Sequence, residues 1–304
     1  MVHWVPVIFM KKQIQGSILL LIGTFIWGTA FVAQSVGMEY IEPFTFQTGR
    51  SILAVIALWP VIWLMDRNRD GAKTFKAKWT DKRLWKTGIL CGMALFVASG
   101  LQQVGLVYTD AGKAGFITAM YIVLVPVLGL LFKQKVPGLV WFSVGLAVVG
   151  LYLLSCAGVS EINFGDLMLM VCAAAFAVQI TLIDRLAQDL DGLRLNFVQF
   201  LVVAVLSAIV MALTEKPNWS SIAACAVPLL YTGVMSSAVA YSLQILGQQH
   251  LPSAPASLIM SLESVIAALS GWLLLGESMT GMELLGSALV FTAVILSQLP
   301  AKKQ

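Results

Sequence analysis

Glu263 is the residue whose type and position point most directly to chemistry. It lies near the centre of an apolar stretch, residues 251–278, that is long enough to cross a bilayer. An acidic residue at mid-membrane costs about 2.5–3.5 kcal/mol on insertion scales, so it normally faces a protein interior or a watery cavity. We therefore predict that Glu263 faces a polar cavity and there contacts a substrate or exchanges a proton. A structural hydrogen bond to its serine neighbours, Ser257, Ser261 and Ser264, is the alternative.

Other polar and aromatic side chains within apolar segments are candidates for the same cavity. Tyr241, Gln244 and Gln248 follow the spacing of one helix face. We predict that, with Glu263, the substrate is bound by Trp27, Gln102, Thr118, Tyr121, Gln179, Tyr241 and Gln244. This set combines hydrogen bonding with aromatic contact, which suits an amino acid or a similar zwitterion. The alternatives are a bond between neighbouring helices for each glutamine, worth about 0.6 kcal/mol, and packing for Trp27 and Tyr121.

The sequence lacks the groups that most membrane enzymes use. Its only histidines are His3 and His250, so no HExxH zinc site, no intramembrane Ser-His pair and no haem-ligating pair is available. There is no Walker A loop and no basic patch for nucleic acid. The four cysteines, at 91, 156, 172 and 225, form no CxxC pair and are expected to be buried apolar side chains. We predict no metal, no cofactor, no nucleic-acid partner and no enzymatic activity.

Membrane-spanning helices must position these residues. The 304 residues are 59% hydrophobic and 11% charged, whereas soluble domains carry about 25% charged residues. Ten apolar segments approach the roughly 20 residues that a bilayer core requires. They lie at about 14–35, 44–64, 86–107, 113–132, 137–156, 165–184, 194–213, 224–249, 254–275 and 280–299. We predict an all-α integral membrane protein with ten transmembrane helices, in which residues 66–85 form the only long loop.

The basic residues predict the orientation of the chain. Of the 19 lysines and arginines, only Lys113 and Lys216 fall on one side, Arg50 falls within a span, and the rest fall on the other side. The positive-inside rule therefore places both termini in the cytoplasm. The predicted location is the plasma membrane, of the bacterial inner-membrane type. We expect Arg50 to form a structural pair with a carboxylate or with carbonyls, with substrate contact as the alternative, and Lys113 to be a solvated loop charge.

Two halves of the chain, residues 14–156 and 163–299, look like copies of one another. A shift of 149 residues sets Gly16 against Gly165 and Arg50 against Gln199. After the long loop the shift becomes 142, and the sequence LQQVG from residue 101 then matches LQILG from residue 243, with Tyr121 opposite Glu263. Because each half contains an odd number of spans, the halves must be inserted in opposite orientations. Secondary transporters use such inverted repeats, with the substrate site at mid-membrane where the repeats meet.

Several motifs resemble the EamA-type transporters of the drug/metabolite transporter superfamily. They are WGTAFV at 27–32, FIT at 116–118 with Pro126, LESVIAAL at 262–269 and GWLLLGE at 271–277. The resemblance covers both halves, and the block around Glu263 is its most specific part. Ser264 departs from the pattern, since many relatives have proline there. The resemblance implies ten helices, two inverted repeats, a central cavity and movement of small metabolites without ATP.

We interpret the chain as a secondary transporter, favouring export, that moves a small polar or amphipathic metabolite such as an amino acid by alternating access. A passive channel or facilitator and an integral membrane enzyme or scaffold subunit are the alternatives. The expected partners are the small-molecule substrate and membrane lipid. Transport is expected to be coupled to protons or to substrate exchange, and the protein to be a monomer or a homodimer.

Overall fold

The computed structural model describes residues 4–69, 78–109, 111–155, 162–275 and 279–299, and within these ranges it contains helices and no strand. In the first half of the chain the helices are α1 (Trp4–Met38), α2 (Pro43–Arg69), α4 (Lys82–Tyr108), α5 (Ala111–Ala119), α6 (Tyr121–Leu131) and α7 (Gly138–Ser155). In the second half they are α8 (Phe164–Leu186), α9 (Gly192–Thr214), α10 (Trp219–Ala224), α11 (Ala226–Leu230), η1 (Tyr231–Ala240), α12 (Tyr241–Gln248), α13 (Ser253–Met260), α14 (Leu262–Leu275) and α15 (Gly281–Ser297).

Eight helical stretches of the described residues are long and apolar enough to cross a membrane. They are Lys11–Met38, Pro43–Arg67, Lys82–Tyr108, Gly112–Leu131, Phe164–Leu186, Gly192–Thr214, Ala226–Gln248 and Ser253–Ser270. Two shorter apolar helices, Gly138–Leu154 and Gly281–Ser297, coincide with the predicted fifth and tenth spans. The all-helical membrane class is therefore confirmed.

The connection between α2 and α4 is shorter than predicted. Of the expected loop, residues 66–85, the first four belong to α2 and the last four to α4, while residues 70–77 lie outside the described part. Asp81 caps α4 by accepting a hydrogen bond from the backbone N–H of Arg83. An aspartate at this position satisfies one of the free N–H groups at a helix start, which explains why the helix begins here.

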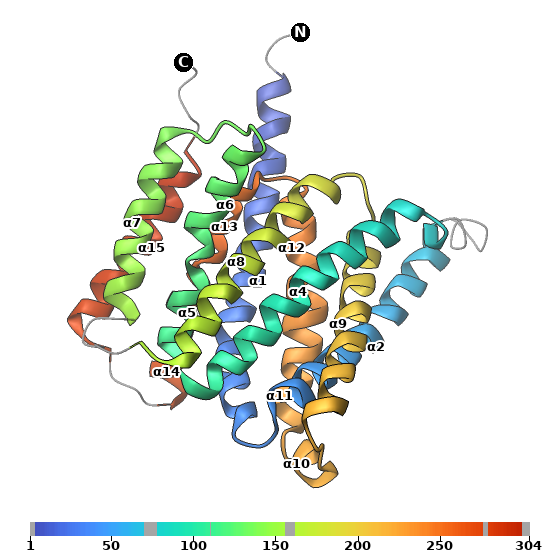
Figure 1. Ribbon diagram of the computed structural model, residues 1–304. Helices are drawn as coiled ribbons and strands as arrows, with labels where there is room; N and C mark the ends of the chain where they lie inside the picture. The colour runs from blue at the N-terminus through green and yellow to red at the C-terminus, as the bar shows by residue number, and fades with distance from the viewer. Residues whose placement is uncertain (1–3, 70–77, 110, 156–161, 276–278, 300–304) are drawn as a thin grey trace.

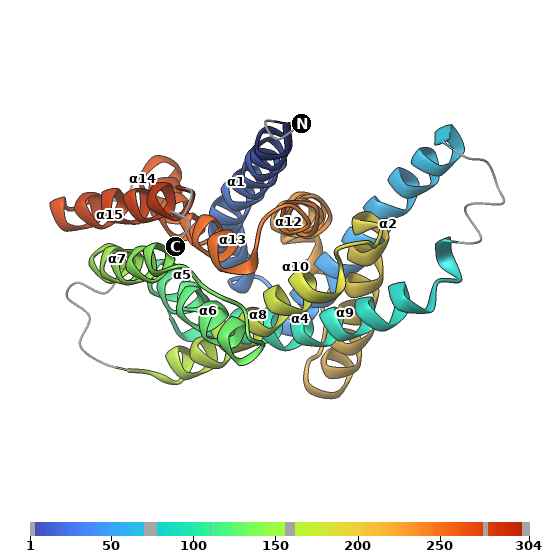
Figure 2. The same ribbon diagram turned by 90° about the horizontal axis from the view of Figure 1, so that it is seen from above.

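The helices form a broad bundle in which α7 and α15 lie side by side on one flank and α2 and α9 on the other (Figure 2). Between these flanks α4 packs along α8, and α1 packs against α12 and α14. The helix α1 begins at the end of the bundle where α15 terminates, whereas α8 begins at the opposite end (Figure 1).

Glycines mark two crossings at which helices approach closely. A Cβ atom added to Gly16 in α1 would lie 2.8 Å from the carbonyl oxygen of Gly247 in α12. A Cβ atom added to Gly165 in α8 would likewise lie 2.8 Å from the carbonyl oxygen of Gly105 in α4. Real Cβ atoms do not come this close to backbone, so only glycine fits at these positions. Small residues at helix interfaces are typical of packing inside membranes.

Ion pairs join helix ends at both ends of the bundle. The buried Arg194 at the start of α9 pairs with Asp66 near the end of α2, and also with Asp191. Where α5 and α8 begin, the Lys113 ammonium lies 2.6 Å from a carboxylate oxygen of Asp166. The side chain of Lys113 is only 13% exposed, so the prediction of a solvated loop charge is wrong.

The described cysteines behave as predicted. Cys91, Cys172 and Cys225 are buried free thiols, which confirms their role as small apolar side chains. Cys156 lies outside the described residues, as do residues 276–278 at the end of the motif that follows Glu263.

Candidate functional site

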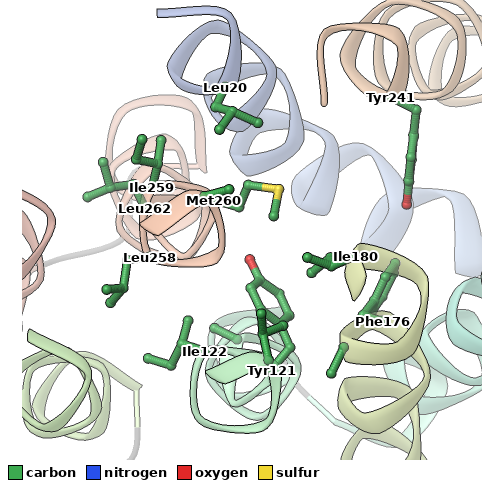
Figure 3. Close-up of a cluster of buried hydrophobic side chains, with 14 of the residues drawn as sticks. Leu20, Tyr121, Ile122, Phe176, Ile180, Tyr241, Leu258, Ile259, Met260 and Leu262 are labelled. Carbon is green, nitrogen blue, oxygen red and sulfur yellow. The ribbon is translucent and has the colours of Figure 1, made fainter. Parts of the chain in front are cut away.

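A cavity lies among the central helices, in contact with both halves of the chain. It contains about 440 Å³ of empty space, part of which opens to solvent. Its walls come from α1, α2, α4, α6, α8, η1, α12, α13 and α14. Figure 3 shows Tyr121, Phe176, Met260 and Tyr241 around a common space, each from a different helix. The lining residues are Trp27, Phe31, Gln34, Arg50, Gln102, Tyr121, Phe176, Ile180, Ser236, Tyr241, Gln244, Met260 and Glu263.

Two spans carry a single-residue turn beside this cavity. In the fourth predicted span a turn at Met120 separates α5 from α6, and in the ninth a turn at Ser261 separates α13 from α14. Both residues keep right-handed helical backbone angles, so each span continues as one helical stretch. Ser257 and Ser261 donate their hydroxyls to backbone carbonyls three residues earlier, and such bonds compete with the regular helix pattern. Each turn comes shortly before a cavity residue, Tyr121 in one span and Glu263 in the other.

Tyr121 and Glu263 are bonded to one another. The Tyr121 hydroxyl donates to Oε1 of Glu263 at 3.0 Å, and both side chains are buried. Glu263 therefore faces the cavity, as predicted. The alternative of a bond to its serine neighbours is not what the structure contains, because Ser257 and Ser261 bond their own helix. Ser264 instead donates to the carbonyl of Gly115 in α5 at 3.0 Å, which joins the fourth and ninth predicted spans.

The predicted glutamines occupy two depths of the wall. Gln102 and Gln244 line the cavity, whereas Thr118 and Gln179 do not. Thr118 accepts a long hydrogen bond of 3.5 Å from Gln102, and Gln179 accepts one of 3.2 Å from Gln244. Thr118 and Gln179 therefore lie behind the wall and orient the amides in front of them. Oε1 of Gln244 is buried and has no hydrogen-bond partner among the described residues.

Aromatic rings form another part of the wall. The ring centroids of Trp27 and Tyr241 are 4.8 Å apart in an edge-on arrangement, and Phe200 packs on the other side of Tyr241 at 5.2 Å. The indole N–H of Trp27 is buried and has no partner in the described part of the chain. A buried polar group without a partner is costly, so this N–H and Oε1 of Gln244 each lack a bond that the described residues do not supply.

Arg50 also lines the cavity, and here the sequence interpretation needs correction. We expected a structural pair with a carboxylate or with carbonyls. Among the described residues its hydrogen bonds go to the amide carbonyl of Gln34 and to the hydroxyls of Ser236 and Ser237, so a carbonyl partner is present and a carboxylate partner is not. Gln34 was visible in the sequence as a polar residue in an apolar segment, but we did not select it.

The remaining lining residues were also missed. Phe31, Phe176, Ile180 and Met260 have no property that separates a cavity wall from a packed core, so residue type could not identify them. Ser236 lies in a segment whose geometry the sequence did not predict. The eight predicted site residues thus comprise six that line the cavity and two that support it; their binding role remains a prediction.

These features define a class of protein: a multi-pass membrane protein with a polar cavity among its central helices. The model of the EamA-like transporter family matches residues 14–156 and 163–299. The chain belongs to this family, which also establishes that it is a transporter rather than an enzyme.

Individual relatives agree with this assignment. An uncharacterized transporter of Archaeoglobus fulgidus is 31% identical over 95% of this chain and 87% of its own length. The threonine/homoserine exporter RhtA of Escherichia coli K12 is 30% identical, over 57% of this chain and 59% of its own length. A solved crystal structure with 14% sequence identity superimposes with a TM-score of 0.76 over 92% of this chain and 95% of that one, which shows the shared fold.

Proposed function

We propose that this protein is a secondary transporter that exports a small polar or amphipathic metabolite, such as an amino acid, by alternating access. The observation that carries the proposal is the polar cavity among the central helices, whose lining residues come from both halves of the chain. The substrate sites of many secondary transporters lie near mid-membrane where two repeats meet. The similarity to an exporter of threonine and homoserine supports an amino acid as the substrate class.

We further propose that the two halves are inverted repeats, each of five transmembrane helices. The sequence shifts equate Gly16 with Gly165 and Gly105 with Gly247, and the structure contains the close contacts Gly16 to Gly247 and Gly165 to Gly105. Replacing each glycine by its equivalent in the other half turns one contact into the other, as expected for two halves related by a two-fold axis. Tyr121 and Glu263 are also equivalent, and two equivalent residues in contact must lie at the two-fold axis. The turns at Met120 and Ser261 are one residue out of register, because the shift of 142 equates Met120 with Leu262.

The ten-helix count follows if α7 and α15 also cross the membrane. With 18 and 17 residues they are roughly 27 and 26 Å long at 1.5 Å per residue, close to the thickness of a bilayer core. The positive-inside pattern then supports cytoplasmic termini in a plasma membrane. The start of α1 and the end of α15 at one end of the bundle support termini on one side (Figure 1). We propose a monomer or a homodimer.

In this mechanism the cavity residues bind the substrate, and Glu263 contacts its amine or exchanges a proton. Transport is then coupled to protons or to substrate exchange. Trp27 and Gln244 line the cavity, and the indole N–H and Oε1 that have no partner among the described residues are the donor and acceptor we assign to the polar part of the substrate. The hydroxyl of Tyr121 holds the carboxyl group of Glu263 in place.

Counterflow in proteoliposomes tests the proposal. Vesicles loaded with unlabelled L-threonine should accumulate labelled threonine transiently, because a carrier exchanges one molecule for another. A passive channel would show flux that neither saturates nor exchanges. Panels of other amino acids, nucleosides and sugars extend the test to the wider substrate class, and movement of none of them would contradict it.

The variant Glu263→Gln should abolish transport while the protein remains folded. The amide cannot exchange a proton and carries no charge for an ammonium group. Glu39→Gln is the matched control, because Glu39 is exposed near the end of α1 and away from the cavity. Unchanged transport by Glu263→Gln would remove this residue from the mechanism.

A further inference from the structure

Arg50 is a buried cation that forms no ion pair with any residue the structure describes. Its side chain is only 3% exposed and forms part of the cavity wall. Nε donates to the hydroxyl of Ser237 at 3.1 Å, Nη1 to Oε1 of Gln34 at 2.6 Å, and Nη2 to the hydroxyl of Ser236 at 3.1 Å. No carboxylate pairs with it within the described ranges of the chain. Charged residues at this depth are usually paired or functional.

The neutral partners leave part of the guanidinium free. An arginine side chain carries five N–H donors in a planar fork, and three of them are used here. One N–H remains on each of the two terminal nitrogens. Two such N–H groups match the two oxygens of a carboxylate, which arginine binds in a bidentate manner.

The surrounding helices hold the guanidinium in place. Ser236 and Ser237 lie in η1, a π-helix, and both consecutive serines reach Arg50. Asn196 of α9 donates to the carbonyls of Ser237 and Ala238 at 3.1 and 3.0 Å, which fixes this part of η1. π-helical segments are rare and often occur at functional sites. The guanidinium of Arg50 is therefore held in a defined orientation in the cavity wall.

The position of Arg50 is also where the two halves differ. At the equivalent position the second half has Gln199, whose amide bonds to Asn196 and Gln179. The first half thus places a charge where the second half completes a neutral network. Helix packing does not require the charge, because the neutral side chain serves at the equivalent site.

We propose that Arg50, together with Gln34, Ser236 and Ser237, forms a subsite for the carboxylate of the transported molecule. The proposal rests on the transport function proposed above and names the substrate class as carboxylate-bearing. Glu263 lines the same cavity but bonds Tyr121 rather than Arg50. A cationic and an acidic group held by separate partners fit a zwitterion. A phosphate dianion would face one guanidinium and a repelling carboxyl group.

The test compares free amino acids with their amides, because these differ only in the carboxylate. The thermal unfolding midpoint of the purified full-length protein in detergent is measured with each of the twenty amino acids and with each amide. The acids and amides that raise the midpoint are then compared as substrates by counterflow in proteoliposomes. For wild type we expect at least one free acid to bind about tenfold or more tightly than its amide, since a charged hydrogen bond is replaced by a neutral one.

Variants at Arg50 locate the effect. Arg50→Gln should bind acid and amide with equal affinity, and Arg50→Lys should keep only part of the preference, because it has the charge without the fork. The lysine variant also guards against a folding defect in Arg50→Gln. The control Arg185→Gln alters an exposed arginine at the end of α8 and should leave the preference intact.

Three results would overturn the inference. The first is equal binding of acid and amide by wild type, and the second is an undiminished preference in both Arg50 variants. The third is competition by inorganic phosphate that exceeds that of every amino acid. If no free acid binds but a molecule without a carboxylate shows counterflow, the carboxylate subsite fails while the transporter function stands. If nothing shows counterflow, the proposed function fails as well.

Discussion

Alanine at Gly165 tests the close approach of α8 and α4. The new Cβ atom would lie 2.5 Å from the hydroxyl oxygen of Thr109 and 2.8 Å from the carbonyl oxygen of Gly105. The Thr109 hydroxyl is already bonded to Asn163 and Asp166, and the carbonyl belongs to the backbone of α4. Neither atom moves aside cheaply, so the helices must separate.

The size of the effect follows from two opposing contributions. Overpacking costs about 1–3 kcal/mol, whereas the better helix propensity of alanine returns at most about 1 kcal/mol. Gly165→Ala should therefore be destabilised. Gly145→Ala is the matched control: Gly145 is inside α7, and a Cβ atom there meets nothing within 4 Å. Only the propensity acts at that site, so the control should be as stable as wild type or more stable.

Thermal unfolding of the detergent-solubilised protein, followed by size exclusion, measures the difference. In domains of 150–250 residues each kcal/mol shifts the midpoint by roughly 2–4 °C, so a drop of several degrees is expected for Gly165→Ala. Gly16→Ala should show a similar drop, because its Cβ atom meets the carbonyl of Gly247 at 2.8 Å. The packing explanation would be refuted by an unchanged or raised midpoint for Gly165→Ala. It would also be refuted if the Gly145→Ala control lost as much stability as Gly165→Ala.

Two further predictions concern the ends of α2. Asp66→Asn weakens the bond to the buried Arg194 and should lower the free energy of unfolding by about 1.5–3 kcal/mol. Lys78→Gln removes only a more exposed partner of the same carboxylate, at 3.5 Å, and should lower it by less than about 1 kcal/mol. Equal thermal unfolding midpoints for the two variants would contradict this. Glu215→Gln should lower the free energy of unfolding by about 1–2 kcal/mol. The two carboxylate oxygens of Glu215 accept bonds from the first N–H groups of α2 at 2.8 and 2.6 Å, and a glutamine has only one acceptor oxygen. Retained hydrogen-exchange protection at the start of α2 would argue against this prediction.

The positions of the helices could be predicted because a bilayer imposes a length on each apolar segment. The position of Glu263 at the cavity could be predicted, because its charge is costly everywhere in the membrane except beside a cavity or a partner. It could not be predicted that Gln244 lines the cavity whereas Gln179 lies behind its wall. Helical periodicity assigns a residue to a face, but the depth at which it meets a cavity depends on how neighbouring helices are placed.

Two local features lay beyond sequence reasoning for a different reason. The π-helix η1 arises when hydrogen bonds shift by one residue, and the residue types of Tyr231–Ala240 did not predict that shift. The partners of Arg50 come from α1 and η1, far away in sequence. Nothing in residue types shows which helix faces an arginine, so a buried cation was given the commoner interpretation of a structural pair.

The contacts divide the bundle into a fixed part and a part free to change. At one end of α2 and α9, Glu215 holds the start of α2, and at the other Arg194 holds Asp66, so this pair of helices is joined at both ends. Arg50 lies on α2, whereas α6, α13 and α14 contribute other parts of the cavity wall. We therefore expect substrate binding to move α6, α13 and α14 relative to α9. Spin labels at the exposed Leu273 of α14 and Val205 of α9, in a cysteine-free background, should change separation on adding substrate. Labels at Ile56 of α2 and Val205 should not; the reverse result would mean that α2 and α9 are the moving part.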